Sequence, residues 1–71
     1  MLPVTDLRTC QSAAARLRST NTEIEFKNPI SNNPKSKCWL ESNKYGKYVK
    51  FKPHLESSQQ ICLNGKFKID G

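Results

Sequence analysis

The first part of the chain has the apolar spacing of an α-helix. Four side chains recur at intervals of three and four residues and form one stripe: Leu7, Cys10, Ala14 and Leu17. Three consecutive alanines at positions 13–15 favour a helix. Thr5 or Asp6 can cap it by accepting hydrogen bonds from the first free amides. We therefore expect a flexible start at residues 1–4 and a helix over residues 5–18.

The remaining pattern has a period of two, which is typical of strands. In residues 23–27 Ile24 and Phe26 share one face, and a loop rich in proline and asparagine is expected at residues 29–34. Two strands are predicted over residues 37–41 and 47–52, separated by a turn at residues 42–46.

An Asn-Gly pair at positions 64 and 65 predicts a two-residue hairpin between residues 60–63 and 66–70, because a type I′ turn needs positive φ at both central residues. Cys62 would then pair with Phe67. We expect an α+β fold over residues 1–71. One N-terminal helix would pack on an antiparallel meander of four or five strands spanning residues 22–70.

Three cysteines are available to stabilise a domain of 71 residues, a size at which a hydrophobic core alone is marginal. Cys38–Cys62 is the plainest pairing within a sheet, and Cys10–Cys62 is the rival because both side chains are predicted to face the core. No C-x-x-C pair is present, and one cysteine is left over. Small size with cysteines favours a secreted or periplasmic protein over an intracellular one, although no signal peptide can be read at the start.

The positive charge of the chain is concentrated in one window. Between Lys27 and Lys52 there are seven lysines and one acid, Glu41, whereas five basic and five acidic residues balance elsewhere. Such a localised field can steer an acidic partner toward one side of the protein. On the predicted strand Lys50 and Lys52 share one face. The candidate partner-binding residues are Lys35, Lys37, Trp39, Lys47, Tyr48, Lys50 and Lys52.

The same residues also have a structural interpretation. A lysine-rich face keeps a sheet soluble and protects its edges from pairing, and Trp39 and Tyr48 could cap a small core. No catalytic motif is present, and His54 is the only histidine. We expect no enzymatic activity, no metal, no cofactor and no membrane insertion of this segment.

Several short segments resemble the chemokines. Residues 6–8 look like the acidic-Leu-Arg element before the first cysteine of one chemokine group, and residues 24–26 with the following proline resemble the first strand that leads to the third cysteine, here Cys38. Residues 48–51 and 60–64 are similar to the last two strands and the final cysteine. The chain would be a variant with one N-terminal cysteine and without the C-terminal helix. The resemblance implies a secreted ligand of a membrane receptor that also binds sulfated glycans through its lysines.

The function expected from these features is a secreted, disulfide-stapled binding domain. Its lysine-rich sheet face would engage a sulfated glycan, a receptor or another acidic protein surface. An intracellular nucleic-acid-binding module is the alternative. A third possibility is a structural or assembly subunit, because the order of helix and strands resembles a pilin-like head.

Overall fold

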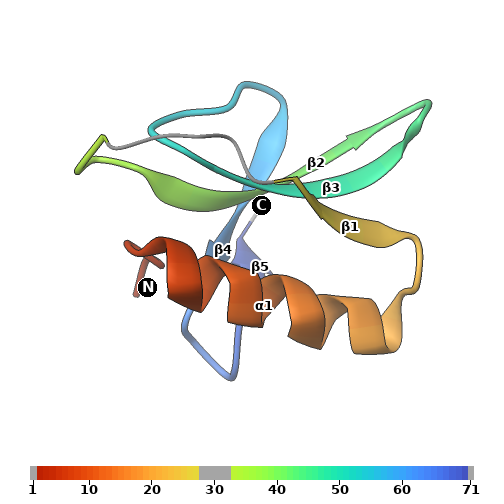
Figure 1. Cartoon of the computed structure of the whole chain (residues 1–71), viewed down its shortest axis with the longest axis horizontal. Helices are drawn as coiled ribbons and strands as arrows, with labels where there is room; N and C mark the ends of the chain where they lie inside the picture. The colour runs from red at the N-terminus through yellow and green to blue at the C-terminus, as the bar shows by residue number, and fades with distance from the viewer. Residues whose placement is uncertain (1, 28–32, 71) are drawn as a thin grey trace.

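The computed structural model describes residues 2–27 and 33–70, which form one helix and a five-stranded sheet (Figure 1). This confirms the α+β class. Of the loop expected at residues 29–34, only positions 33 and 34 lie within the described residues. The elements are α1 Leu7–Thr20, β1 Ile24–Lys27, β2 Lys37–Asn43, β3 Gly46–Lys52, β4 Ser58–Cys62 and β5 Lys68–Asp70.

The sheet is mixed, not the expected antiparallel meander. Its strand order is β1-β3-β2-β4-β5; β1 runs parallel to β3, and the other neighbouring strands are antiparallel. Strands β2 and β3 form a tight hairpin in which Asn43 pairs with Gly46 across Lys44 and Tyr45. Gly46 has a φ of +144°, a conformation that other residues rarely adopt. Because β2 occupies one edge of β3, β1 joins the other edge.

Asp6, not Thr5, is the N-cap of helix α1, which begins at Leu7, two residues later than expected. The Asp6 carboxylate accepts hydrogen bonds from the Thr9 backbone N–H at 2.9 Å and from the Thr9 hydroxyl at 2.8 Å. These bonds satisfy an amide that would otherwise lack a partner at the helix start, and they lower the pKa of Asp6. The helix ends two residues later than expected, at Thr20, where Asn21 is extended and its N–H bonds to the Leu17 carbonyl.

The core lies between α1 and one face of the sheet. Figure 1 shows the helix crossing beneath this face. From the helix Cys10, Ala13 and Ala14 are buried, with Leu7 and Leu17 packed beside them, so the predicted apolar stripe is confirmed. The sheet contributes alternate residues, which are Ile24, Cys38, Leu40, Val49, Phe51 and Ile61. No helix of the described chain covers the opposite face, and none is long and apolar enough to span a membrane.

Residues 2–4 are packed against the end of β4, contrary to the flexible start expected there. Val4 is fully buried, and Pro3 forms an isolated bridge with Cys62. The Leu63 backbone N–H donates to the Leu2 carbonyl at 2.7 Å. Val4 contributes to the core, but its burial could not be predicted because it does not belong to a periodic apolar pattern.

The β4–β5 hairpin differs by one residue from the predicted register. Cys62 pairs with Lys68 and Ile61 with Ile69, so residues 63–67 form a five-residue connection instead of a two-residue turn. The predicted register sets Ile69 opposite Gln60, the neighbour of the core-facing Ile61, whose side chain points to the other side of the sheet. A slip of one residue exchanges the two faces of a strand, so packing of the partly buried Ile69 against the core favours the observed pairing over the local turn preference.

The disulfide joins Cys10 to Cys38, and the predicted Cys38–Cys62 pair is wrong, as is its rival Cys10–Cys62. Neighbouring residues of a strand point to opposite faces, so Cys62 faces away from the side of its core-facing neighbour Ile61. Cys38 faces α1, where Cys10 lies on the buried stripe. Their Cα atoms are 5.4 Å apart, within the normal range for a disulfide. Cys62 is outside this bond and is 2% exposed.

Candidate binding face

The sheet face opposite α1 carries most of the predicted binding residues. Alternation along β3 sends Val49 and Phe51 into the core, which leaves Lys50 and Lys52 on the other side, as predicted, together with Tyr48. The same alternation in β2 directs Lys37, Trp39 and Glu41 to this side, and in β1 Glu25 and Lys27. We call this surface the open face, and define it by Glu25, Lys27, Lys37, Trp39, Glu41, Tyr48, Lys50 and Lys52.

Strand register brings lysines of the open face directly opposite one another. Lys37 pairs with Lys52 across β2 and β3, and Lys27 pairs with Lys50 across β1 and β3. Like charges at directly opposed positions destabilise a sheet, by an amount comparable to the roughly 0.2–1 kcal/mol that a favourable pair contributes. The open face therefore has an electrostatic cost that an acidic partner would relieve.

Trp39 lies among these lysines in a defined orientation. It is half-buried, and it pairs with Lys50 on one side and with Gln60 on the other. The indole N–H donates to the Lys52 carbonyl at 2.9 Å, and the ring meets His54 edge-on with centroids 5.7 Å apart. Because its polar edge is already satisfied, Trp39 offers a partner apolar area rather than a hydrogen bond.

Tyr48 is held at the side of the open face that β1 borders. The ammonium of Lys27 lies 4.1 Å from the centroid of the Tyr48 ring, within the range of a cation–π contact. The Tyr48 hydroxyl donates to the Tyr45 carbonyl in the β2–β3 turn at 3.1 Å. These two contacts connect β1, β3 and the turn.

Glu41 partly neutralises the open face. Its carboxylate forms an ion pair with Lys50, and both side chains are about one-fifth exposed, at 24% and 19% respectively. The hydrogen bond from Lys50 lowers the pKa of Glu41, and the positive charges of Lys50, Lys52 and Lys27 act in the same direction. At neutral pH one of the lysines is thus internally compensated, and Lys37 and Lys52 have no carboxylate in ion-pair contact among the described residues.

The structure separates the predicted binding residues into three groups. Lys35 lies in a turn ahead of β2, where its N–H bonds to the Asn33 side chain, and is not on the sheet. Lys47 lies on the opposite face, since it alternates with Tyr48 and shares the side of Val49. The members that share the open face are Lys37, Trp39, Tyr48, Lys50 and Lys52.

Lys27 belongs to the open face although it was not predicted as a site residue. Its position depends on the parallel pairing of β1 with β3, which places it beside Lys50 and over Tyr48. The alternation of residues 23–27 did give its direction relative to Ile24 and Phe26. No local pattern in the sequence predicted that β1 would pair with β3.

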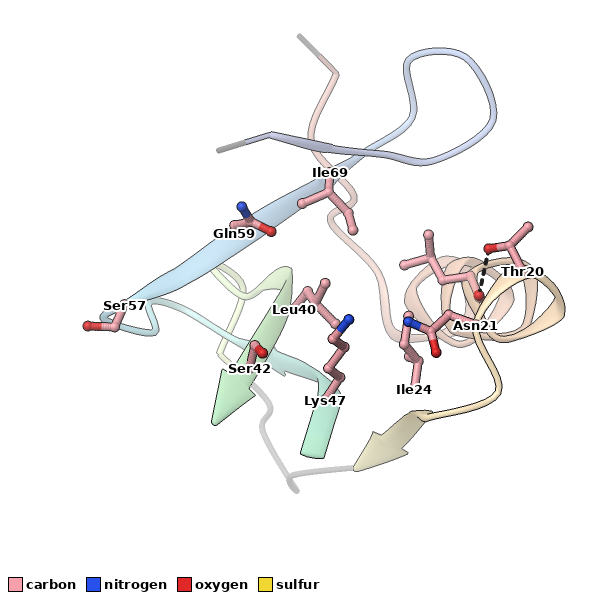
Figure 2. Close-up of a pocket in the computed structure, with 10 residues that line it drawn as sticks. Thr20, Asn21, Ile24, Leu40, Ser42, Lys47, Ser57, Gln59 and Ile69 are labelled. Atoms are coloured by element: carbon pink, nitrogen blue, oxygen red, sulfur yellow. Dashed lines mark hydrogen bonds between the residues drawn. The ribbon is translucent and has the colours of Figure 1, made fainter. Parts of the chain in front are cut away.

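A separate hollow contains Lys47 on the helix side of the sheet. Its volume is about 600 Å³, and residues from the end of α1 and from all five strands line it. Figure 2 shows the side chains of Lys47 and Asn21 directed into the same space, which Leu40 and Ile69 border. The hollow and the open face are therefore on opposite sides of one sheet.

Comparison with family models, curated proteins and solved structures finds no match to this chain. The described residues also hold no group of three or more potential metal ligands. The functional argument consequently depends on the geometry of the chain itself.

Proposed function

We propose that this protein is a non-enzymatic binding domain whose open face engages an acidic partner. One observation carries the proposal, namely the direct pairing of Lys37 with Lys52 across the two central strands. Within the described chain neither side chain has a carboxylate in ion-pair contact. A surface that only kept the sheet soluble would gain from alternating signs at these positions.

The aromatic residue at the centre of the face supports a contact surface. Trp39 is immobilised by its bond to the Lys52 carbonyl and by His54, so little side-chain entropy would be lost on binding. Tryptophan is among the residues that dominate binding energy in protein interfaces. A rigid apolar patch surrounded by ammonium groups suits a partner with both acidic groups and flat apolar area.

The partner class that we favour is a sulfated glycan or an acidic protein surface met outside the cell. The open face presents lysines and no arginine, and lysine acts as a point charge without the planar, bidentate recognition of base edges. The disulfide supports an oxidising compartment. An intracellular nucleic-acid-binding module is the alternative, in which Trp39 would stack on a base.

The test compares two variants with the same change in net charge. Lys37→Glu/Lys52→Glu reverses the paired lysines of the open face, and Lys44→Glu/Lys66→Glu reverses two exposed lysines in turns. Both are passed over immobilised heparin and over a single-stranded oligonucleotide in a gradient of NaCl. We expect the open-face variant to elute from heparin at a much lower salt concentration than the control variant, because ionic contacts dominate.

If both variants lose heparin affinity equally, net charge alone explains the loss, and this result would contradict a site on the open face. The nucleic-acid alternative would be favoured if the unmodified protein stays on the oligonucleotide at higher salt than on heparin, and if the open-face variant loses this retention. Circular dichroism of both variants confirms that the fold is retained.

A further inference from the structure

The hollow beside Lys47 has a structural origin in the way the helix covers the sheet. Helix α1 packs chiefly on β1, β3 and β2, and beyond its end the inner side of the sheet is left exposed at Gln59 of β4. Lys47 lies in the last row of the inner face, where it pairs with Ile24 on β1 and with Ser42 on β2. The layer between helix and sheet therefore ends in a space of about 600 Å³, a volume within the range of small-molecule sites.

The lining combines an apolar border with one positive charge. Leu17, Ile24, Leu40 and Ile69 supply the aliphatic part, and Lys47 is the only charged side chain that lines the hollow among the described residues. No described carboxylate is in ion-pair contact with Lys47. An ammonium beside aliphatic side chains and without a carboxylate partner attracts an anion whose remaining part is apolar.

Asn21 provides a second polar group at the same position. Its side-chain oxygen accepts a bond from the Glu23 backbone N–H at 3.1 Å, which fixes the amide, and Figure 2 shows this side chain directed into the hollow. At the helix end the Leu17 carbonyl already accepts from the Asn21 N–H and from the Thr20 hydroxyl, so it does not compete for the Asn21 amide. Lys47 and Asn21 can thus hold one anionic head between them.

We propose that this hollow binds a small amphiphilic anion, such as an aliphatic carboxylate of medium chain length. The carboxylate would accept hydrogen bonds from the Lys47 ammonium and the Asn21 amide. The aliphatic chain would lie against Leu40 and Ile69. This site is on the helix side of the sheet, so it is independent of the acidic partner proposed for the open face.

The test uses three probes with the intact chain and follows backbone and methyl signals by NMR. Decanoate carries both the charge and the chain, decanol has only the chain, and acetate has only the charge. Below its micelle concentration, decanoate should shift the signals of Lys47, Leu40 and Ile69 in a saturable way. Decanol should bind at least about tenfold more weakly, because a charge-assisted hydrogen bond is lost, and acetate should cause no saturable shift.

Two variants test whether decanoate binds at Lys47. Lys47→Met keeps an unbranched side chain, one atom shorter and without the charge, and should weaken decanoate binding about tenfold while leaving decanol binding unchanged. Lys66→Met removes one exposed lysine elsewhere and should bind decanoate as the unmodified protein does. Equal affinity of Lys47→Met for decanoate, or shifts confined to Trp39 and the open face, would overturn the proposal. Absence of saturable decanoate binding would also overturn it.

Discussion

Cys10 of α1 and Cys38 of β2 are joined across the core with their Cα atoms 5.4 Å apart. The bond connects the helix to a central strand of the sheet and not, as the pattern of strands suggested, one strand to another. It spans a sequence separation of 28 residues that includes β1. The disulfide therefore holds the helix covalently against the sheet, with the hydrophobic core between them.

Reduction of this disulfide should destabilise the protein strongly. In the chain-entropy model a loop of this length contributes about 3.6 kcal/mol to the free energy of unfolding. A domain of this size has a total of only about 4–11 kcal/mol at ordinary stabilities per residue. Urea unfolding of the oxidised protein and of the variant Cys10→Ser/Cys38→Ser measures the difference. A change below about 1 kcal/mol would contradict the role that we assign to the bond.

The pairing itself can be read from a tryptic digest without reduction. Cys10 falls in the peptide 9–16 and Cys38 in the peptide 38–44, so the observed bond predicts that these two peptides are linked. A link between 38–44 and the peptide 51–66, which contains Cys62, would show the other pairing instead.

Asp6 should stabilise the helix in a pH-dependent manner. Loss of an N-cap carboxylate costs about 1 kcal/mol, so Asp6→Ala should lower the free energy of unfolding by this amount at pH 7. The hydrogen bonds from Thr9 lower the pKa of Asp6 in the folded state, so its contribution is complete above the unfolded pKa near 4. It is lost as the pH falls through the lowered folded value.

The difference between the unmodified protein and Asp6→Ala should therefore shrink below about pH 4. Thr5→Ala serves as the control, because Thr5 is exposed and is not the capping residue. A difference that stays constant from pH 7 to pH 2.5 would show that the Asp6 carboxylate does not act through its charge.

Glu41 should weaken the binding of polyanions to the open face. Its ion pair neutralises Lys50, so Glu41→Gln frees this ammonium and should raise the salt concentration needed to elute the protein from heparin. Stability should change little, as is usual for ion pairs near the surface. In the unmodified protein binding should strengthen as the pH falls through the lowered pKa of Glu41, because the carboxyl group becomes neutral. Glu23→Gln, which is exposed and outside the open face, is the matched control.

The register of the last hairpin can be tested with two adjacent substitutions. Ile69 packs against the core opposite Ile61, whereas Lys68 is exposed. Ile69→Ala should lower the free energy of unfolding by about 2 kcal/mol, the lower part of the range for buried aliphatic truncations, since Ile69 is partly buried. Lys68→Ala should change it by less than about 0.5 kcal/mol. Similar small effects for both residues would indicate that β5 does not pair as described.

The helix and the strand positions could be predicted from the sequence because they follow from local periodicity. The common face of Lys50 and Lys52 followed from the same alternation. The neighbours of each strand could not be obtained in this way. The position of Lys27, the register of β5 and the disulfide all depend on which segments meet in space, and core burial decides this against local turn preference. Lys47 was assigned to the wrong face within a correctly predicted strand. Its charge suggested the open face, but it is two residues from Val49 and therefore lies on the same side of the sheet as Val49, facing the helix.

The parallel pairing of β1 with β3 has a consequence for the order of folding. The β2–β3 hairpin closes through the two residues Lys44 and Tyr45, so it forms at a small cost in chain entropy. Strand β1 has β3 as its neighbour in the sheet, and α1 packs chiefly on β1, β3 and β2, so both gain most of their contacts once the hairpin is present. The hairpin would then act as the folding nucleus, with substitutions in β2 and β3 slowing folding and those in β1 chiefly accelerating unfolding.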